Sequence, residues 1–405
     1  MSRSVEVIGA GLAGLAAACR FAQLGWRVSL HERSSELRMF GAGIWLWESG
    51  LKTLTVLGAF EQATARARTI KEWRIADRNG NTLMTRPMTG ADRLLLPPRA
   101  DLYQALIDRA TALGVEIFTS SIVTDVKPEG EVVLQNGTRR RADLVLIANG
   151  AYSVLREQIL ATAWMDFGIE AGIRMLIDQK PGEPTDIITE YWDGAWRLLF
   201  NPCTSGENYI FLSAPVGDER ARKLPIDRAV WKEHFPDAGD LIDRFSEASR
   251  WDRLVNVRCR HWSDGRVAVI GDAAHAMPPN LGQAANTAFI NIMALAMILE
   301  DKLDIPAALR VWETAQRPIS DHVQWWSYLY GFVLGKWPEK HLALRSDALR
   351  ALSKTEWFDY SLNLGARHVP AGFEGTGVST PQVPRKFPVE SVVSMLVTQA
   401  IGQAV

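Results

Sequence analysis

The chain has 405 residues, of which 47% are hydrophobic and 22% are charged, and its formal net charge at pH 7 is −1. This balance offers no electrostatic reason to expect nucleic acid or an anionic membrane surface as a partner. Three irregularly spaced cysteines, Cys19, Cys203 and Cys259, argue against a disulfide framework or a metal site and favour a reducing, cytoplasmic location. No run approaches the roughly 20 apolar residues of a membrane span, and the length predicts two interlocked domains.

The first distinctive stretch lies almost at the N-terminus. An apolar run over residues 5–8 ends in Gly9, Gly11 and Gly14, spaced G-x-G-x-x-G, and an alanine-rich stretch follows. The pattern predicts a strand, a tight turn and a helix. In such a turn the first glycine permits the bend, the second lets the backbone approach a diphosphate, and the third lets helix and strand pack closely.

A second predicted strand, residues 28–31, ends in the acidic residue Glu32, about eighteen residues beyond Gly14. A carboxylate at this distance suits the hydroxyl pair of a ribose, so turn and acid together predict a dinucleotide site. The alternative is a glycine-rich turn in an ordinary α/β protein. We expect His31 to be structural or to lie near an adenine ring.

Further along, Gly41 and Gly43 indicate another close backbone approach, and residues 51–60 predict a short helix. Residues 73–83 alternate around Arg78-Asn79-Gly80-Asn81, which is typical of a hairpin. A helix is expected to begin at Arg99. Strands are expected at 115–118, 132–134 and 144–147.

From about residue 160 to 258, short runs of β-branched and aromatic residues predict an antiparallel sheet. The apolar residues 267–270 predict another buried strand. Helices are expected at 282–300 and 306–331, the latter with an irregularity at Pro318. Residues 371–388 predict an extended wrap, and the apolar tail 392–405 predicts a packing helix or, less simply, an oligomer contact.

The most specific string runs from Gly271 to Asn286. Asp272, at the end of a strand, can accept hydrogen bonds from sugar-like hydroxyls. Pro278 and Pro279 stiffen the turn that follows. Gly282 is then expected to open a helix whose free N–H groups can stabilise negative charge on a bound ring.

Three motifs occur in a fixed order over about 300 residues: the glycine triplet with Glu32, the string from Ala148 to Arg156, and Gly271-Asp272. Together they resemble the FAD-dependent aromatic hydroxylases of the p-hydroxybenzoate hydroxylase type. The resemblance implies α/β plus antiparallel β architecture, with a Rossmann-like FAD-binding domain of the glutathione reductase type and C-terminal helices. The implied divisions are 1–72, 98–158 and 255–330 for FAD, 73–97 and 159–254 for substrate, and 331–405 for the C-terminal segment.

The same resemblance implies a monooxygenase that uses FAD, NADH or NADPH, and O2 to oxygenate an aromatic ring through a flavin C4a-hydroperoxide. A homodimer is a further expectation. The residues implied to bind the cofactor are Gly9, Gly11, Leu12, Ala13, Gly14, Glu32, Arg33, Gly43, Arg99, Val123, Asp272, Pro278, Leu281, Gly282, Gln283, Ala284 and Asn286.

Within this family, the segments around residues 30–47 and 312–319 resemble the oxygenases of 2-methyl-3-hydroxypyridine-5-carboxylic acid, which open a pyridine ring. The resemblance places the substrate-site pair on Arg197 and Tyr209. An arginine fork suits a carboxylate, and a tyrosine hydroxyl can hold a ring hydroxyl or nitrogen. A further tyrosine of that site aligns with Ile70. The implied substrate is therefore a 3-hydroxypyridine carboxylate or a phenol-like ring, either hydroxylated or opened.

Two positions depart from the family pattern: Asn149 and Asn291 stand where aspartate is usual. His275 is expected to be structural. The Trp45-Leu46-Trp47 string does not indicate a halogenase, because its context differs. The alternatives are a flavin oxidase or reductase of the same fold, or a flavin-binding protein without turnover.

Overall fold

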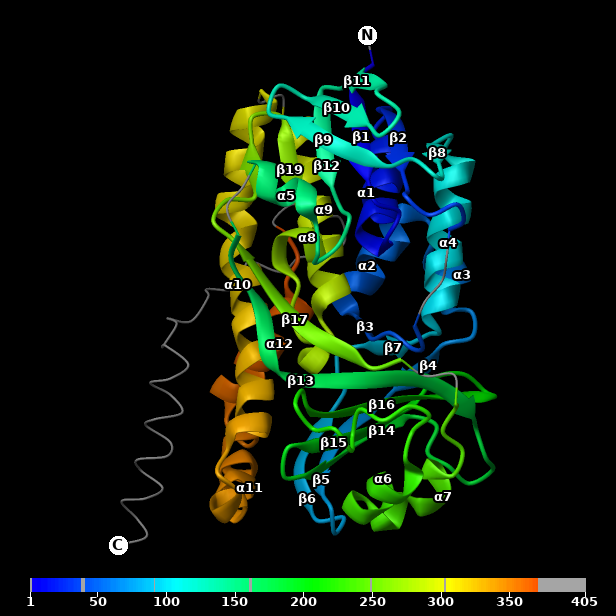
Figure 1. The fold of residues 1–405 in the computed structure, drawn as a ribbon, viewed down its shortest axis with the longest axis vertical. Coiled ribbons are helices and arrows are strands. Elements are labelled where there is room, and N and C mark those ends of the chain that lie inside the picture. Colours follow the sequence, from blue (N-terminus) through cyan, green and yellow to red (C-terminus); the bar gives the residue numbers. More distant parts are fainter. Residues whose placement is uncertain are drawn as a thin grey trace, which may run out of the picture.

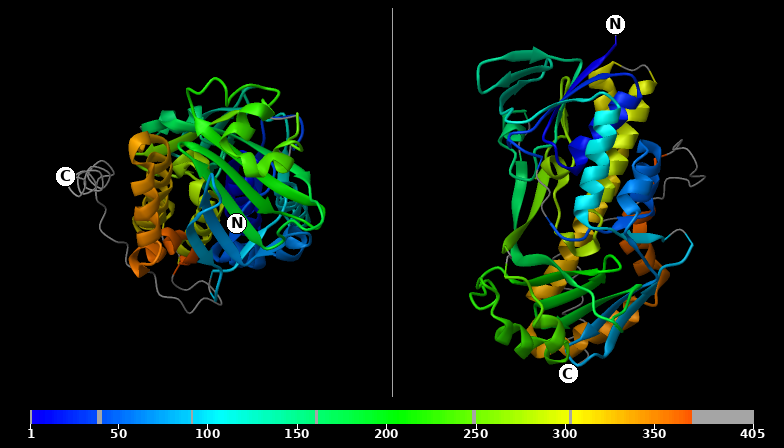
Figure 2. Two further views of the ribbon diagram at one scale, coloured as in Figure 1. Left: turned by 90° about the horizontal axis from the view of Figure 1, so that it is seen from below. Right: turned by 90° about the vertical axis from the view of Figure 1, so that its right-hand side faces the viewer.

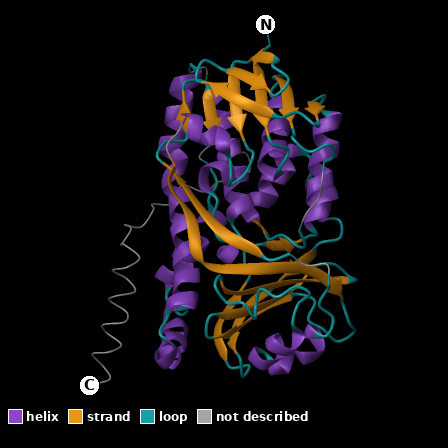
Figure 3. Cartoon of the chain, viewed as in Figure 1, coloured by secondary structure: helices purple, strands orange, loops and turns teal. Residues whose placement is uncertain are grey.

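The computed structural model describes residues 2–37, 41–90, 92–159, 162–247, 250–301 and 304–370, with only the backbone over 162–167. The molecule is elongated, with its two main sheets at opposite ends and the long helix α10 (Ile305–Lys336) running beside both (Figure 1). Figure 3 shows the same two groups of strands with helices beside and between them. This mixed α/β architecture with C-terminal helices confirms the expected fold class.

The first sheet has six strands in the order β18-β19-β12-β1-β2-β8. All neighbours are parallel except β18 and β19. Continuous apolar runs suit strands that are covered on both faces. The strands are β1 (Ser4–Ile8), β2 (Arg27–His31), β8 (Glu116–Phe118), β12 (Leu144–Ile147), β18 (Ser263–Asp264) and β19 (Val267–Val269).

Helices cover one face of this sheet and a small antiparallel sheet covers the other (Figure 2, right panel). The helices are α1 (Leu12–Gln23), α4 (Arg99–Ala112) and α9 (Ala284–Glu300), and the small sheet joins β9 (Val123–Lys127), β10 (Glu131–Leu134) and β11 (Arg139–Arg141). The strands expected at 115–118 and 144–147 therefore enter the main sheet, whereas that at 132–134 enters the small one.

The second sheet has seven strands in the order β17-β13-β16-β15-β14-β5-β6. One face packs on the helices α6 (Arg228–His234) and α7 (Gly239–Ile242), and the other packs toward α10. The strands are β5 (Glu72–Asp77), β6 (Thr82–Pro87), β13 (Thr162–Asp178), β14 (Ile187–Asp193), β15 (Trp196–Pro202), β16 (Glu207–Pro215) and β17 (Asp252–Cys259). We propose that the two sheets mark the cofactor and substrate domains.

The remaining elements connect or cover these sheets. They are β3 (Leu46–Trp47), α2 (Glu48–Leu57), α3 (Phe60–Thr64), β4 (Arg68–Ile70), β7 (Leu94–Leu96), α5 (Val154–Ile159), η1 (Pro236–Ala238), α8 (Asp272–His275), η2 (Pro279–Leu281), η3 (Glu339–His341), α11 (Leu342–Leu352) and α12 (Glu356–Arg367). The expected wrap at 371–388 and tail at 392–405 lie outside the described residues.

Two expected helix boundaries are wrong, each because of one left-handed glycine. The helix expected at 51–60 divides because Gly58 adopts a left-handed conformation (φ +73°) after α2. The helix expected at 282 begins at Ala284, since Gly282 is also left-handed (φ +61°). Helix α10 continues through Pro318 and packs on α9 and α12, and the expected irregularity at this proline stays a prediction.

Candidate active site

The three glycines of the first turn have different surroundings. A Cβ added to Gly9 (φ +107°) would lie 2.6 Å from the carbonyl oxygen of Ala148, and one added to Gly14 would lie 1.9 Å from that of Gly9. A Cβ on Gly11 would meet nothing within 4 Å. Two glycines are therefore required by packing, while Gly11 borders open space. The first turn of α1 has no side-chain cap, which leaves its N–H groups available to an anion.

Glu32 is held against this turn. Its carboxylate accepts hydrogen bonds from the backbone N–H of Ala10 at 3.0 Å and of Ser34 at 2.9 Å. Tyr103 of α4 donates to the carbonyl oxygen of Ala10 at 2.8 Å. The acid that the sequence singled out thus lies beside the glycine turn, and it is only half-buried. Its neighbour Arg33 is exposed, and Val123 lies half-buried at the start of β9.

The Gly271-Asp272 segment meets the same turn from the far end of the chain. A Cβ added to Gly271 (φ +58°) would lie 2.6 Å from Cβ of Ala13 in α1. Asp272 remains exposed to solvent, yet the surrounding protein desolvates its carboxyl and raises its pKa, while Arg99 and Arg174 act in the opposite direction. The Asp272 carboxyl is therefore exposed to solvent, although it lies next to the uncapped N-terminus of α1.

Asn149 follows β12 beside the glycine turn. A Cβ on Gly9 would lie 2.8 Å from its Cα, and its buried Oδ1 has no hydrogen-bond partner among the described residues. Further along this string, Nη1 of buried Arg156 donates to the carbonyl oxygen of Ala273 at 2.9 Å. The string therefore supports the segment that carries Asp272.

The segment from Pro278 to Asn286 is attached mainly through side chains. The buried Asn286 amide accepts from N–H of Trp47 at 3.0 Å and donates to the carbonyl oxygens of Trp45 at 3.0 Å and Gly282 at 3.1 Å. Nε2 of Gln283 donates to the carbonyl oxygen of Leu362 at 2.8 Å. These two amides thus fix the turn between the domains. Gly282 and Ala284 remain half-buried, whereas Pro278 and Leu281 are buried.

His275 has a structural environment. Its Nε2 lies 3.0 Å from Nδ2 of Asn291, which also donates to Oγ of Ser320 at 2.9 Å. Burial lowers the pKa of His275 to about 4, so the ring is neutral and accepts the amide proton. An asparagine at 291 fits this neutral partner without burying a charge.

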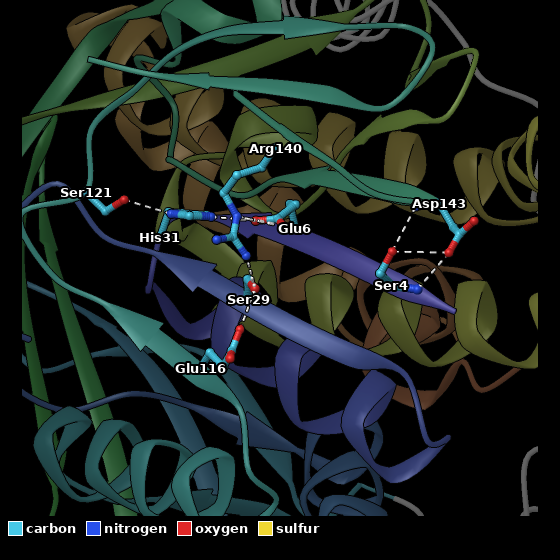
Figure 4. A network of polar contacts seen from close by, with 8 residues as sticks. All are labelled: Ser4, Glu6, Ser29, His31, Glu116, Ser121, Arg140 and Asp143. Atoms are coloured by element: carbon cyan, nitrogen blue, oxygen red, sulfur yellow. Dashed lines mark hydrogen bonds and ion pairs between the residues drawn. The ribbon is translucent and has the colours of Figure 1, made fainter. Parts of the chain in front are cut away.

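His31 also has fixed partners, in a polar network on the face of the first sheet that β9, β10 and β11 cover (Figure 4). Its Nε2 lies 2.6 Å from Oε2 of Glu6, and its Nδ1 lies 2.7 Å from Oγ of Ser121. Arg140 of β11 donates to Glu6 and to Ser29. This network holds the small sheet onto the larger one.

Tyr209 lies on the face of the second sheet that packs against Gly43. A Cβ on Gly43 would lie 2.7 Å from Cδ1 of its ring, so Gly43 provides the surface on which that ring packs. Burial raises the pKa of Tyr209, and the charge and hydrogen bond of Arg174 oppose the rise. The aligned position Ile70 is buried in the same apolar cluster.

The pairing of β15 with β16 shows whether Arg197 and Tyr209 lie on the same face of the second sheet. Arg197 pairs with Ser213 and Asn201 pairs with Tyr209, so both residues belong to the same alternate set. Arg197, however, is 1% exposed and lies between two carboxylates. Its Nη1 is 3.1 Å from Oε1 of Glu170, and its Nε is 2.8 Å from Oε1 of Glu190.

Sequence reasoning missed Arg174, Glu170 and Glu190. Arg174 of β13 is half-buried, contacts the Phe211 ring at 5.2 Å from its centroid, and interacts with both Tyr209 and Asp272. Its alternation with Glu170 and Gly172 was visible, but the pairing of β13 with β16 joins residues far apart in the sequence, such as Arg174 and Phe211. No pattern of neighbouring residues in the sequence indicates the contacts of Arg174.

Metal-ligand groups and membrane spans are the last two features of the described residues. Over the residues with described positions, no group of three or more His, Cys, Asp or Glu side chains could hold a metal ion. No helix in that part of the chain has the length and apolar character needed to cross a membrane.

Comparison with known proteins bears on the same features. A family model described as an FAD binding domain matches residues 2–323. The 2-heptyl-3-hydroxy-4(1H)-quinolone synthase of Mycobacteroides abscessus is 34% identical over 363 residues, which cover 87% of this chain and 96% of that protein. The 3-amino-4-hydroxybenzoate 2-monooxygenase of Streptomyces cremeus is 28% identical over 337 residues, covering 78% and 83%.

Among solved structures, the tetrameric form of 2-methyl-3-hydroxypyridine-5-carboxylic acid oxygenase superposes with a TM-score of 0.79 at 34% identity. The match covers 91% of this chain and 96% of that one. The HpxO protein of Klebsiella pneumoniae, complexed with FAD and uric acid, has the same fold, with a TM-score of 0.79 at 21% identity and coverage of 90% and 97%.

Proposed function

Because this chain belongs to the FAD-dependent aromatic monooxygenases, we propose that it uses NADH or NADPH and O2 to oxygenate a hydroxylated aromatic or N-heteroaromatic ring. The observation that carries the proposal is the contact between Gly271 and Ala13, which brings Asp272 to the glycine turn from about 260 residues away. A dinucleotide turn alone fits many reactions. The added acid fits the ribityl and diphosphate part of a flavin dinucleotide.

The residues present fit FAD. Uncapped N–H groups at Leu12 and Ala13, beside the open space at Gly11, suit the diphosphate, and Glu32 suits the adenosine ribose. Exposed Arg99 and Asp272 would border the ribityl and diphosphate region. We assign Gly43 and the turn from Pro278 to Ala284 to the flavin ring. Asn286 and Gln283 would act by holding this turn, since their amides already bond to protein.

When bound, FAD supplies the electron transfer from NAD(P)H and the activation of O2. The chain's own task is to exclude water, to orient the ring and to favour its electron-rich form. Tyr209 is our candidate for contact with a ring hydroxyl or nitrogen, because it lies between Gly43 and Arg174. Arg197 would position the flavin turn, because its Nη1 donates to Oδ1 of Asn280 at 2.5 Å.

The names of two relatives support chemistry on a ring of this kind. The quinolone synthase and the hydroxypyridine oxygenase both take their names from nitrogen heterocycles that carry a hydroxyl group.

The test uses the purified protein with bound FAD and a panel of hydroxypyridines, hydroxyquinolines and hydroxybenzoates. We expect at least one ring to accelerate NAD(P)H oxidation and to yield an oxygenated product. Mass spectrometry after reaction under ¹⁸O2 separates one incorporated oxygen atom, for hydroxylation, from two, for ring opening. A protein that cannot be reconstituted with FAD, or one that no ring stimulates, would contradict the proposal.

A further inference from the structure

Arg197 is the residue that the resemblance pairs with a substrate carboxylate, yet its charge already has partners. Glu170 from β13 and Glu190 from β14 lie 3.1 Å and 2.8 Å from its guanidinium nitrogens. All three side chains are at most 2% exposed. One cation thus lies between two acids in a dry part of the sheet, where unpaired charge is costly.

The carboxylates are themselves fixed by the fold. Oε1 of Glu190 accepts from Nε1 of Trp192 and from the Tyr330 hydroxyl, each at 2.7 Å. Asn280 accepts from Arg197 at 2.5 Å and donates to the carbonyl oxygen of Ser327 at 2.9 Å. Nη1 and Nε of Arg197 therefore already have protein partners, and the planar faces of the guanidinium contact the rings of Phe211 and Tyr330.

A third carboxylate at Arg197 would bury further negative charge beside Glu170 and Glu190. Such an arrangement requires the ligand to displace an internal acid, or both acids to take up protons. Burial already raises the pKa of Glu170, with the nearby Glu190 charge adding to the rise and Arg197 opposing it. Because two acids surround one guanidinium, the geometry of the network disfavours a further carboxylate at Arg197.

Other arginines also lie around this face. Arg86 lies 3.7 Å from Asp92, and its buried Nε and Nη2 have no hydrogen-bond partner among the described residues. Nη1 of Arg345 donates to the carbonyl oxygens of Gly194 and Leu334. Arg174 interacts with Asp272 and lies 3.9 Å from Asp252. Under the proposed function, Arg174 and Arg99 belong to the charge balance of the FAD diphosphate.

We propose that Glu170 and Glu190 stand in for a substrate carboxylate at Arg197, so that the enzyme selects uncharged hydroxylated N-heteroaromatic rings over their carboxylated counterparts. This inference rests on the proposed function and narrows its substrate class. The Phe211, Trp192, Trp73 and Leu199 side chains belong to the buried apolar cluster on this face of the sheet, so the surroundings favour an uncharged ring over a charged one.

The test titrates the FAD-bound protein with ligand pairs that differ only in a carboxylate, followed by the change in flavin absorbance. The pairs are 3-hydroxypyridine with 5-hydroxypyridine-3-carboxylate, and 4-hydroxyquinoline with its 2-carboxylate. We expect the uncharged member to bind at least about tenfold more tightly. Equal or tighter binding of the carboxylated members would overturn the inference while leaving the proposed function intact. Binding of neither member, with no stimulated NAD(P)H oxidation, would refute the proposed function, and the inference with it.

A variant series gives a second measurement. In Glu170→Gln and in Glu170→Gln/Glu190→Gln, Arg197 loses one or both counter-charges, so the preference for the uncharged ring should shrink stepwise. Glu300→Gln, whose half-exposed carboxylate pairs with Arg20 at the surface, is the matched control and should keep the wild-type ratio. An unchanged ratio in a folded double variant would contradict the inference. If the double variant does not fold, the wild-type titration still decides.

Discussion

The two ends of the molecule position functional groups by different means. At the six-stranded sheet, the site is made by backbone and by missing side chains: a Cβ on Gly14 would collide with the carbonyl oxygen of Gly9, and Gly11 borders open space. At the seven-stranded sheet, the site is made by paired side chains, with Arg197 between Glu170 and Glu190. The first arrangement is sensitive to one added methyl group, whereas the second is sensitive to one lost charge.

The largest effect is expected from adding that methyl group. Gly14→Ala places Cβ 1.9 Å from a backbone oxygen that cannot move without shifting β1, so we expect a destabilisation of about 3 kcal/mol or more and loss of bound FAD. Thermal unfolding and the flavin content of purified protein measure both. Gly11→Ala is the matched control, which should keep the melting temperature while it weakens FAD binding. A Gly14→Ala protein as stable as wild type would show that backbone packing does not limit the turn.

The charge arrangement is tested by Arg197→Met. Removing the guanidinium leaves two buried carboxylates without their cation, which should cost about 3–5 kcal/mol in urea unfolding. Adding Glu170→Gln and Glu190→Gln should restore much of this loss, because no buried charge then remains unpaired. If the single variant unfolds at the same urea concentration as the wild type, the paired charges around Arg197 do not stabilise the seven-stranded sheet.

His275 brings a pH dependence to the cofactor end. Its pKa is about 4 in the folded chain against 6.5 ordinarily, so the unfolded state binds more protons between these values. Stability should therefore be complete above pH 6.5 and decrease by about 2–3 kcal/mol as the pH falls toward 4. His275→Gln should reduce the dependence of the unfolding free energy on pH across this range. His368, whose pKa burial also lowers to about 4, should continue to contribute to it. If the unfolding free energy of His275→Gln depends on pH as steeply as that of the wild type, His275 is not the source of the pH dependence.

A smaller effect is expected at Asp272, which is exposed and so contributes little to packing. Asp272→Asn should raise the dissociation constant for FAD by about 10- to 100-fold while leaving the melting temperature of the FAD-free protein unchanged. Fluorescence titration with FAD measures the affinity. If Asp272→Asn binds FAD as tightly as the wild type, Asp272 does not contact the cofactor.

The smallest effect is expected from Tyr209→Phe. The ring still packs on Gly43, so FAD content and stability should be retained, whereas ring ligands should bind about fivefold more weakly for want of one hydrogen bond, about 1 kcal/mol. Flavin difference spectra report the ligand affinity. A loss of FAD without a change in ligand affinity would show that Tyr209 serves the cofactor end instead.

What the sequence alone determined is chiefly local. The glycine triplet, the acid after the second strand, the hairpin at 78–81 and the start of a helix at Arg99 each depend on neighbouring residues, and the structure has all four elements there. The ordered motifs also indicated FAD and the aromatic hydroxylase family before any fold was known. Helix boundaries were wrong at Gly58 and Gly282, because a single left-handed glycine decides where hydrogen bonding stops.

Only the tertiary structure decided how Arg197 is used. Its partners Glu170, Glu190 and Asn280 come from two other strands and from the turn before α9, so their meeting depends on strand order and register. The sequence left two register parities open, because alternation along one strand does not say which residue of another lies opposite. In the folded chain, the register places Arg197 on the same face as Tyr209, and the neighbouring strands place Glu170 and Glu190 beside its guanidinium. The sequence had suggested only that Arg197 binds a substrate carboxylate.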